Sequence, residues 1–182
     1  MARIPYVDPA TAPQHVRELL EQLPASLNIF RVMAHAESSF RPLMRLGAAI
    51  LGRQKLSGAL RELAILRVAK LSAAPYEWVQ HVPIAIAAGV TPAQVEALER
   101  GNAAAACFSE TEQIFLRFTD EVVRDVGASD ATFAAMAERF STQEIVEAVL
   151  AIGFYMTMAR LMQTTGIDLE PDAGTKIIDA LK

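Results

Sequence analysis

The 182-residue sequence has a single cysteine, Cys107. One cysteine cannot form an intrachain disulfide, a Cys-x-x-Cys pair or a thiolate metal cluster. Dithiol redox chemistry within one chain is therefore excluded. Cys107 lies in a stretch of small residues, where we expect a passive, packed or half-exposed thiol. Such sparse use of cysteine is typical of a reducing compartment, so we expect a cytoplasmic protein.

A concentrated charge of one sign and a long hydrophobic run are also missing. The net charge of −4 is spread along the chain without a Lys/Arg block, so we expect no nucleic-acid partner. Residues 1–13 contain three prolines and no apolar signal-peptide core, and we expect an extended arm there. The most apolar uncharged stretch, 148–159, is too short to span a bilayer. We expect a buried core helix there and no membrane partner.

Aromatic residues are few, at 7%, whereas apolar residues make up 52% of the chain. Ala, Leu, Val and Met dominate, and no segment has the two-residue period of a strand. This composition predicts an all-α helical bundle in one domain, residues 1–182. The apolar excess further predicts a homo-oligomer, and the composition leaves open whether it is a dimer, a trimer or a hexamer.

Start and stop signals divide the chain into helices. Pro75 and Thr91–Pro92 are typical of a first turn, and Ser109–Glu112 and Ser141–Glu144 have the spacing of capping boxes. The signals predict helices over the following ranges: about 11–23, 28–36, 38 or 39 to 52, 57–71, 75–89, 91–101, 109–126, 129 or 130 to 140, and 141–166.

The candidate chemistry lies on the two helices 57–71 and 75–89. The first is apolar nearly all round and carries Glu62, a carboxylate that needs a partner when buried. The second carries His81 with Glu77 one turn earlier, a spacing that allows a hydrogen bond between them. A three-residue break makes the pair a hairpin in which Glu62 and His81 can face each other. A proton-transfer centre is one interpretation; a satisfied polar core, or Glu62 paired with Arg61 or Arg67, is the other.

Weaker candidates lie elsewhere. Asn28, Arg31 and His35 form a polar stripe on one helix, where Arg31 could receive a substrate carboxylate or the stripe could simply face solvent. Tyr76 and Trp78 could line a substrate pocket or serve packing. The three histidines lie on separate helices without ligand spacing, so we expect no metal site.

The run RELAILRVAK followed by YEWVQHVPIAIAAGVT resembles the core of the carboxymuconolactone decarboxylase family. That family includes decarboxylases of aromatic catabolism and alkylhydroperoxidase-D-like proteins. The resemblance covers residues 28–165, since the last helix also looks like the closing helix of the family. It implies an all-helical fold that assembles as trimers or hexamers, with pockets near subunit contacts.

The two branches of the family differ at this hairpin. The peroxidase branch carries a Glu, then Cys-x-x-Cys, then a His four residues after the second Cys. In this chain Glu62 and His81 match, but Ala74 and Glu77 stand at the cysteine positions. A thiol peroxidase needs an attacking and a resolving thiol, so we do not expect that activity. The decarboxylase branch also lacks the cysteines and has a Glu where Glu77 stands, but not one at Glu62.

The resemblance therefore favours a lyase or isomerase acting on a carboxylated or lactone-like small molecule. Loss of CO₂ leaves a carbanion that needs charge stabilisation and a proton, and an imidazolium at His81 could supply both. Glu77 would then orient the imidazole and Glu62 would relay the proton. This scheme requires no cofactor. The alternatives are a peroxidase-like antioxidant protein and a non-catalytic protein that binds a ligand or only assembles.

Overall fold

The computed structural model describes residues 1–181, and within this range the chain forms helices and no strand. The prediction of an all-α bundle is confirmed. The helices are α1 (Gln14–Glu21), α2 (Asn28–Met33), α3 (Glu37–Gly52), α4 (Gly58–Leu71), α5 (Pro75–Ala87), α6 (Pro92–Glu99), α7 (Glu110–Asp125), α8 (Asp130–Ala137), α9 (Thr142–Thr165) and α10 (Lys176–Asp179).

The helix starts follow the local signals in the sequence. The side chains of Thr91, Ser109 and Ser141 each accept a hydrogen bond from the backbone N–H three residues later, and each belongs to a complete capping box. Pro75 opens α5 in the first turn, where its missing N–H is not needed. Between α4 and α5, Ala73 has a left-handed φ of 48°, which allows the sharp reversal that forms the hairpin.

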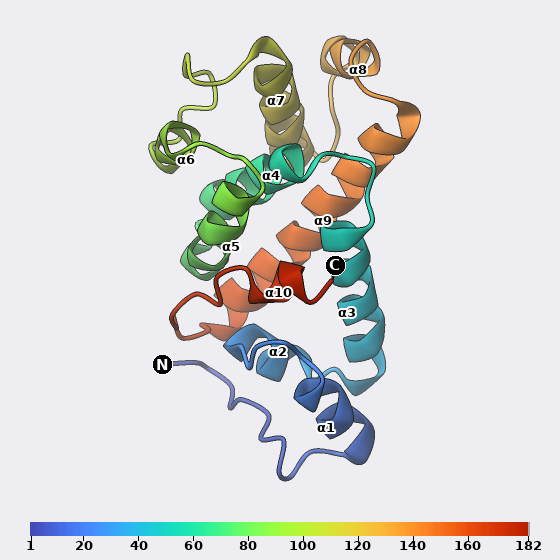
Figure 1. Cartoon of the computed structure of the whole chain (residues 1–182), viewed down its shortest axis with the longest axis vertical. Coiled ribbons are helices and arrows are strands. Elements are labelled where there is room, and N and C mark those ends of the chain that lie inside the picture. Colours follow the sequence, from blue (N-terminus) through green and yellow to red (C-terminus); the bar gives the residue numbers. More distant parts are fainter. Residues whose placement is uncertain (182) are drawn as a thin grey trace.

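Helix α4 lies at the centre of the bundle. All its side chains from Arg61 to Ala69 are buried, which agrees with its apolar character on every side. It packs against α5, α7 and α9, and Figure 1 shows these helices grouped around it. Because α4 is enclosed by its neighbours, the polar side chains that it carries must find partners inside the protein.

Helix α9 is the longest helix and runs through the bundle beside α3 and α4 (Figure 1). It is long and apolar enough to cross a membrane by length and composition. Here one side, including Ala148, Ile152 and Tyr155, is buried in the core. The opposite side exposes apolar residues, among them Val149 and Leu150. A second copy would cover such a face, and the homo-oligomer stays a prediction.

The N-terminal arm packs against the end of α9 and the segment that follows it. The predicted arm is extended over its first residues and packs on its own chain: the Arg3 N–H donates to the Thr165 carbonyl at 2.7 Å, and the N-terminal ammonium lies 3.0 Å from Asp168. The segment after α9 turns back across α5 and ends in α10, close to α3 (Figure 1). This return places the C-terminal segment over the interior of the bundle.

Candidate functional site

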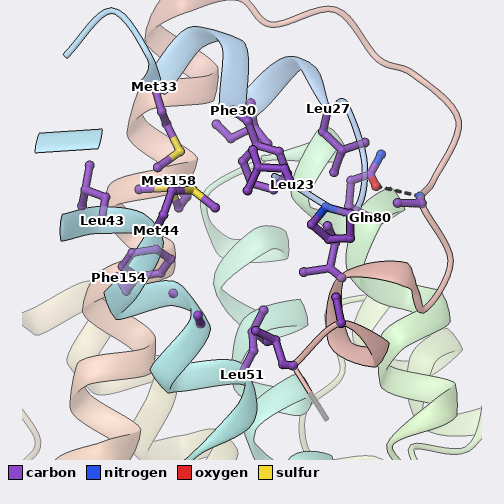
Figure 2. A pocket seen from close by; sticks show the side chains of 18 of the residues that line it. Leu23, Leu27, Phe30, Met33, Leu43, Met44, Leu51, Gln80, Phe154 and Met158 are labelled. Carbon is purple, nitrogen blue, oxygen red and sulfur yellow. Dashed lines mark hydrogen bonds between the residues drawn. The ribbon is translucent and has the colours of Figure 1, made fainter. Parts of the chain in front are cut away.

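A cavity of about 400 Å³ lies between the N-terminal helices, α3, α5, α9 and the C-terminal segment. Most of its wall is apolar. Figure 2 shows Met33, Met44 and Met158 gathered at one side, with Gln80 at the opposite side. Glu77, His81 and Tyr155 also line the cavity. An enclosed apolar space with a few polar groups is the usual form of a small-molecule site.

His81 and Glu62 face each other across the α4–α5 hairpin, as the sequence predicts. His81 Nδ1 lies 2.9 Å from Glu62 Oε2, and Arg61 Nε donates to Glu62 Oε1 at 3.0 Å. Glu62 is completely buried, so its carboxylate depends on these two partners. The Tyr155 ring packs edge-on against the imidazole, with 4.8 Å between the ring centres.

This arrangement fixes how His81 can act. Glu62 accepts from Arg61 and from Nδ1–H of the imidazole, which assigns the proton of the neutral ring to Nδ1. Nε2 is then the nitrogen that can accept a proton, and within residues 1–181 it has no hydrogen-bond partner. A buried carboxylate behind the ring also stabilises the imidazolium that forms after proton uptake.

Glu77 does not make the predicted hydrogen bond to His81. Its side chain is 2% exposed, and neither carboxyl oxygen has a hydrogen-bond partner among the described residues. Nδ1 of the imidazole faces Glu62 instead. Burial, together with the nearby charge of Glu62, raises the pKa of Glu77 well above its usual value. Glu77 is therefore not the orienting partner of His81.

The sequence around the hairpin matches the profile of a known protein family. Residues 37–121, which contain Glu62, Glu77 and His81, match the sequence profile of the carboxymuconolactone decarboxylase family. The family resemblance of the hairpin is therefore supported over this segment. No curated protein matches the chain.

Solved structures show the same fold over nearly the whole chain. An alkylhydroperoxidase AhpD core from Ralstonia eutropha JMP134, described as an uncharacterized peroxidase-related protein, has 20% identity and a TM-score of 0.79, over 93% of this chain and 92% of that chain. An uncharacterized peroxidase-related protein from Silicibacter sp. TM1040 has 18% identity and a TM-score of 0.78, over 94% of this chain and 92% of that chain. A variant of the debrominase Bmp8 in complex with 2,3,4-tribromopyrrole has 16% identity and a TM-score of 0.75, over 97% of this chain and 96% of that chain.

Three predicted substrate-binding residues lie outside the cavity. Arg31 Nε donates to the Val7 carbonyl at 3.0 Å, and its guanidinium lies over the Tyr6 ring. His35 Nε2 lies 2.7 Å from the Pro5 carbonyl. Asn28 contacts Asp168 and Glu170 of the C-terminal segment. These contacts correct the assignment: Asn28, Arg31 and His35 anchor the two ends of the chain.

Tyr76 and Trp78, the two aromatic residues predicted to line the pocket, lie in different places. Tyr76 lines the cavity, and its hydroxyl donates to Glu170 while it accepts from the Ile29 N–H. Burial is the largest cause that raises the pKa of Tyr76, so the phenol stays protonated. Trp78 instead lines a separate surface hollow and packs against the cluster around Leu66. The assignment of Trp78 to the substrate pocket is therefore corrected.

Arg67 and Cys107, two further residues considered from the sequence, make their contacts away from Glu62 and the cavity. Arg67 is not a partner of Glu62, because its guanidinium makes two hydrogen bonds to Asp120, at 2.5 and 2.6 Å. Cys107 is exposed between α6 and α7 and does not line the cavity. Among residues 1–181 no group of three or more His, Cys, Asp or Glu side chains is placed to hold a metal ion.

Sequence reasoning missed two parts of the cavity wall. Tyr155 lies in an apolar run of α9, where nothing in the pattern distinguishes it from packing. The C-terminal segment carries no periodic signal, yet the Ala173 N–H donates to Gln80 Oε1 at 3.1 Å, and Gln80 Nε2 donates to the Pro171 carbonyl at 3.2 Å (Figure 2). The position of Gln80 beside His81 is the one clue that could have pointed to this contact.

Proposed function

We propose that the protein is a thiol-independent enzyme that transfers protons on a small molecule, a lyase or isomerase acting on a carboxylated or lactone-like metabolite. One observation carries the proposal. His81 is fixed by Glu62, which Arg61 holds in turn, and it lines a cavity large enough for an organic substrate. A histidine oriented by a buried carboxylate is a common general base and acid.

In both reaction types the imidazole of His81 carries the proton that is transferred. In an isomerase, Nε2 of His81 removes a proton from carbon and returns it to a different carbon of the same molecule. In a decarboxylase, loss of CO₂ leaves a carbanion, and the imidazolium supplies the proton. Glu62 stabilises the imidazolium in either case, since its carboxylate lies 2.9 Å from Nδ1.

A thiol peroxidase is the less favoured alternative, although two proteins of this fold are described as peroxidase-related. The positions where the peroxidase branch has its cysteines hold Ala74 and Glu77, and Cys107 is exposed elsewhere. The complex of the debrominase with 2,3,4-tribromopyrrole supports a small organic ligand for a fold of this kind.

The test measures proton transfer directly, so the product need not be identified first. The protein is incubated in D₂O with a panel of lactones and carboxylic acids, while NMR follows deuterium uptake at carbon and a CO₂ sensor follows decarboxylation. We expect at least one compound to react, and His81→Ala to lower its rate about a hundred-fold or more. His35→Ala is the matched control, because His35 anchors the N-terminal arm outside the cavity.

The alternatives make different predictions. If no compound reacts, or if His81→Ala reacts as fast as the wild type, the enzyme proposal fails and a ligand-binding or assembly protein is the better description. A thiol-dependent peroxide assay should show no activity. Peroxide turnover that disappears in Cys107→Ser would support the peroxidase instead.

A further inference from the structure

The opening of the cavity carries positive charge. Some of the residues that line the cavity are also exposed, and these form its rim: Gln22, Pro24, Arg41, Arg45 and Ala180. A residue that both lines a cavity and is exposed lies where the cavity meets solvent. Arg41 and Arg45, both on α3, are the charged members of this set. The rim therefore presents two guanidinium groups and no carboxylate.

One face of α3 brings these arginines to the cavity. Four lining residues follow the spacing i, i+3, i+4 and i+7, which places them on the same face of a helix: Arg41, Met44, Arg45 and Ala48. Leu51 continues this face further along the helix, and Figure 2 shows Met44 and Leu51 beside the cavity. The same face thus combines two cations at the rim with an apolar lining.

Arg41 and Arg45 have no acidic partner within residues 1–181. Neither makes a hydrogen bond or an ion pair there. Glu37, one turn before Arg41, lies 3.4 Å from His15 instead. Glu77 is the only acid among the described lining residues, and both of its oxygens are inaccessible. An anion at the rim therefore meets two free cations and no accessible carboxylate of the wall.

The interior of the cavity is suited to an apolar body. Met33, Met44 and Met158 lie together at the side opposite Gln80 (Figure 2), near Phe154. Methionine side chains are flexible and polarizable, so they adapt to different apolar shapes. A charged group would lose its hydration among these side chains, which is costly without a partner. The charged end of a ligand therefore belongs at the rim and its apolar part inside.

We infer that the cavity binds an amphipathic carboxylate, a small molecule whose carboxylate lies at Arg41 and Arg45 while its apolar body fills the interior. A guanidinium presents its N–H donors in one plane and matches the two oxygens of a carboxylate. Burial of the apolar body supplies most of the affinity, and the arginines fix which end stays outside.

This inference rests on the proposed function and narrows its substrate class. The carboxylate held on α3 remains at the rim. The apolar end of the molecule enters the interior, which His81 lines from α5. The carbon on which His81 acts then belongs to the apolar part of the substrate, away from the anchoring carboxylate.

The test compares three ligands that share a ten-carbon chain and differ in the head group: decanoate (anion), 1-decanol (neutral) and decyltrimethylammonium (cation). Calorimetry with the full chain at pH 7, below the micelle concentrations, gives the dissociation constants. We expect decanoate to bind about ten-fold more tightly than decanol, the factor that two exposed ion pairs supply together, and the cation to bind most weakly. Added salt should weaken decanoate binding and leave decanol nearly unchanged, because the rim is exposed.

Substitution of the arginines separates the head group from the chain. Arg41→Gln and Arg45→Gln should each weaken decanoate binding about three-fold, and the double variant should bind decanoate and decanol equally. Arg53→Gln is the matched control for a single charge, because Arg53 is exposed just after α3 and does not line the cavity. It should change neither ligand. All three positions are exposed, so thermal unfolding should show that every variant is folded.

Several results would overturn the inference. They are a wild type that binds decanoate and decanol equally, a double variant that keeps the preference, an equal loss in Arg53→Gln, and no binding of any ligand. A membrane lipid also has an anionic head and apolar chains, so co-sedimentation with phosphatidylglycerol–phosphatidylcholine vesicles is measured as well. The protein should stay in solution. Sedimentation that the double variant loses would place the arginines at a membrane surface and contradict the inference.

The binding test is independent of turnover. Arginine-dependent binding of decanoate, without proton exchange for any compound of the panel, would contradict the proposed function alone. Proton exchange that depends on His81 but is unaffected in the double variant Arg41→Gln/Arg45→Gln would contradict the inference alone.

Discussion

Replacing Glu77 with glutamine should stabilise the protein by an amount that grows as the pH rises. The raised pKa of this buried carboxyl is caused mainly by burial and, to a smaller extent, by the charge of Glu62. Below about pH 4.3, the ordinary value for glutamate, the group is protonated in the folded and unfolded chains alike, and it has no effect on the pH dependence. Above that value the unfolded chain releases the proton while the folded chain keeps it. The wild type therefore loses stability relative to Glu77→Gln as the pH increases.

The size of this loss follows from proton linkage. One proton held by the folded chain and released by the unfolded chain changes the free energy of unfolding by about 1.4 kcal/mol per pH unit. Between pH 4.5 and pH 6 the advantage of Glu77→Gln should thus increase by about 2 kcal/mol. The groups around Glu77, namely Glu62 and Arg61 on α4, His81 on α5 and Tyr155 on α9, are present in both proteins. Their own contributions therefore cancel to first order in the difference.

Urea unfolding followed by circular dichroism at several pH values measures this difference. The protein concentration must be kept constant, because assembly also affects stability. Glu99→Gln is the control, because Glu99 is exposed on α6. The free energy of unfolding of this variant should differ from that of the wild type by an amount that does not change with pH. A flat difference for Glu77→Gln, or a wild type that gains stability with rising pH, would mean that Glu77 is an ionised and stabilised carboxylate. The interpretation of Glu77 as a buried carboxyl with a raised pKa would then be wrong.

Two further predictions concern other parts of the structure. Asp120→Asn leaves the buried guanidinium of Arg67 without its carboxylate and should lower the free energy of unfolding by about 3 kcal/mol, as measured by urea unfolding. Ser141→Ala removes the cap of α9 and should cost about 1 kcal/mol, visible as a lower Tm; an unchanged Tm would contradict the role of the cap.

The sequence predicts the bundle and its hairpin because the signals there are local. Capping residues such as Ser109 and Ser141 act within three residues, and the structure keeps each of them. The contact between Glu62 and His81 also follows from local geometry, since a three-residue break brings the two helices back side by side. Burial of a carboxylate on an apolar helix then makes a partner necessary.

The role of Glu77 could not be predicted in the same way. The spacing to His81 permits a hydrogen bond, but spacing alone does not tell which of the two carboxylates the imidazole faces. Glu62 on the facing helix, with Arg61 beside it, takes Nδ1. The choice is therefore decided by tertiary packing, which leaves Glu77 without a partner among the described residues.

The misassigned residues in and just after α2 show a second limit. Arg31 and His35 have the polar side chains of a binding site, but their partners are backbone carbonyls of the N-terminal arm, at Val7 and Pro5. The arm has no helical or strand period that would reveal where it docks. The C-terminal segment likewise has no such period, yet it contacts Gln80, which lies about ninety residues earlier in the chain. Contacts made by irregular segments leave little trace in a sequence.

Positions 74 and 77 separate this hairpin from that of the peroxidase branch. By the family resemblance they are the places of the two cysteines, next to a histidine and a glutamate that this chain keeps as His81 and Glu62. A thiol peroxidase needs an attacking and a resolving thiol, and Glu77 and Ala74 offer neither. A carboxyl is not oxidised by peroxide. The hairpin thus lacks the thiols of redox chemistry but keeps the pair on which the proposed proton transfer depends.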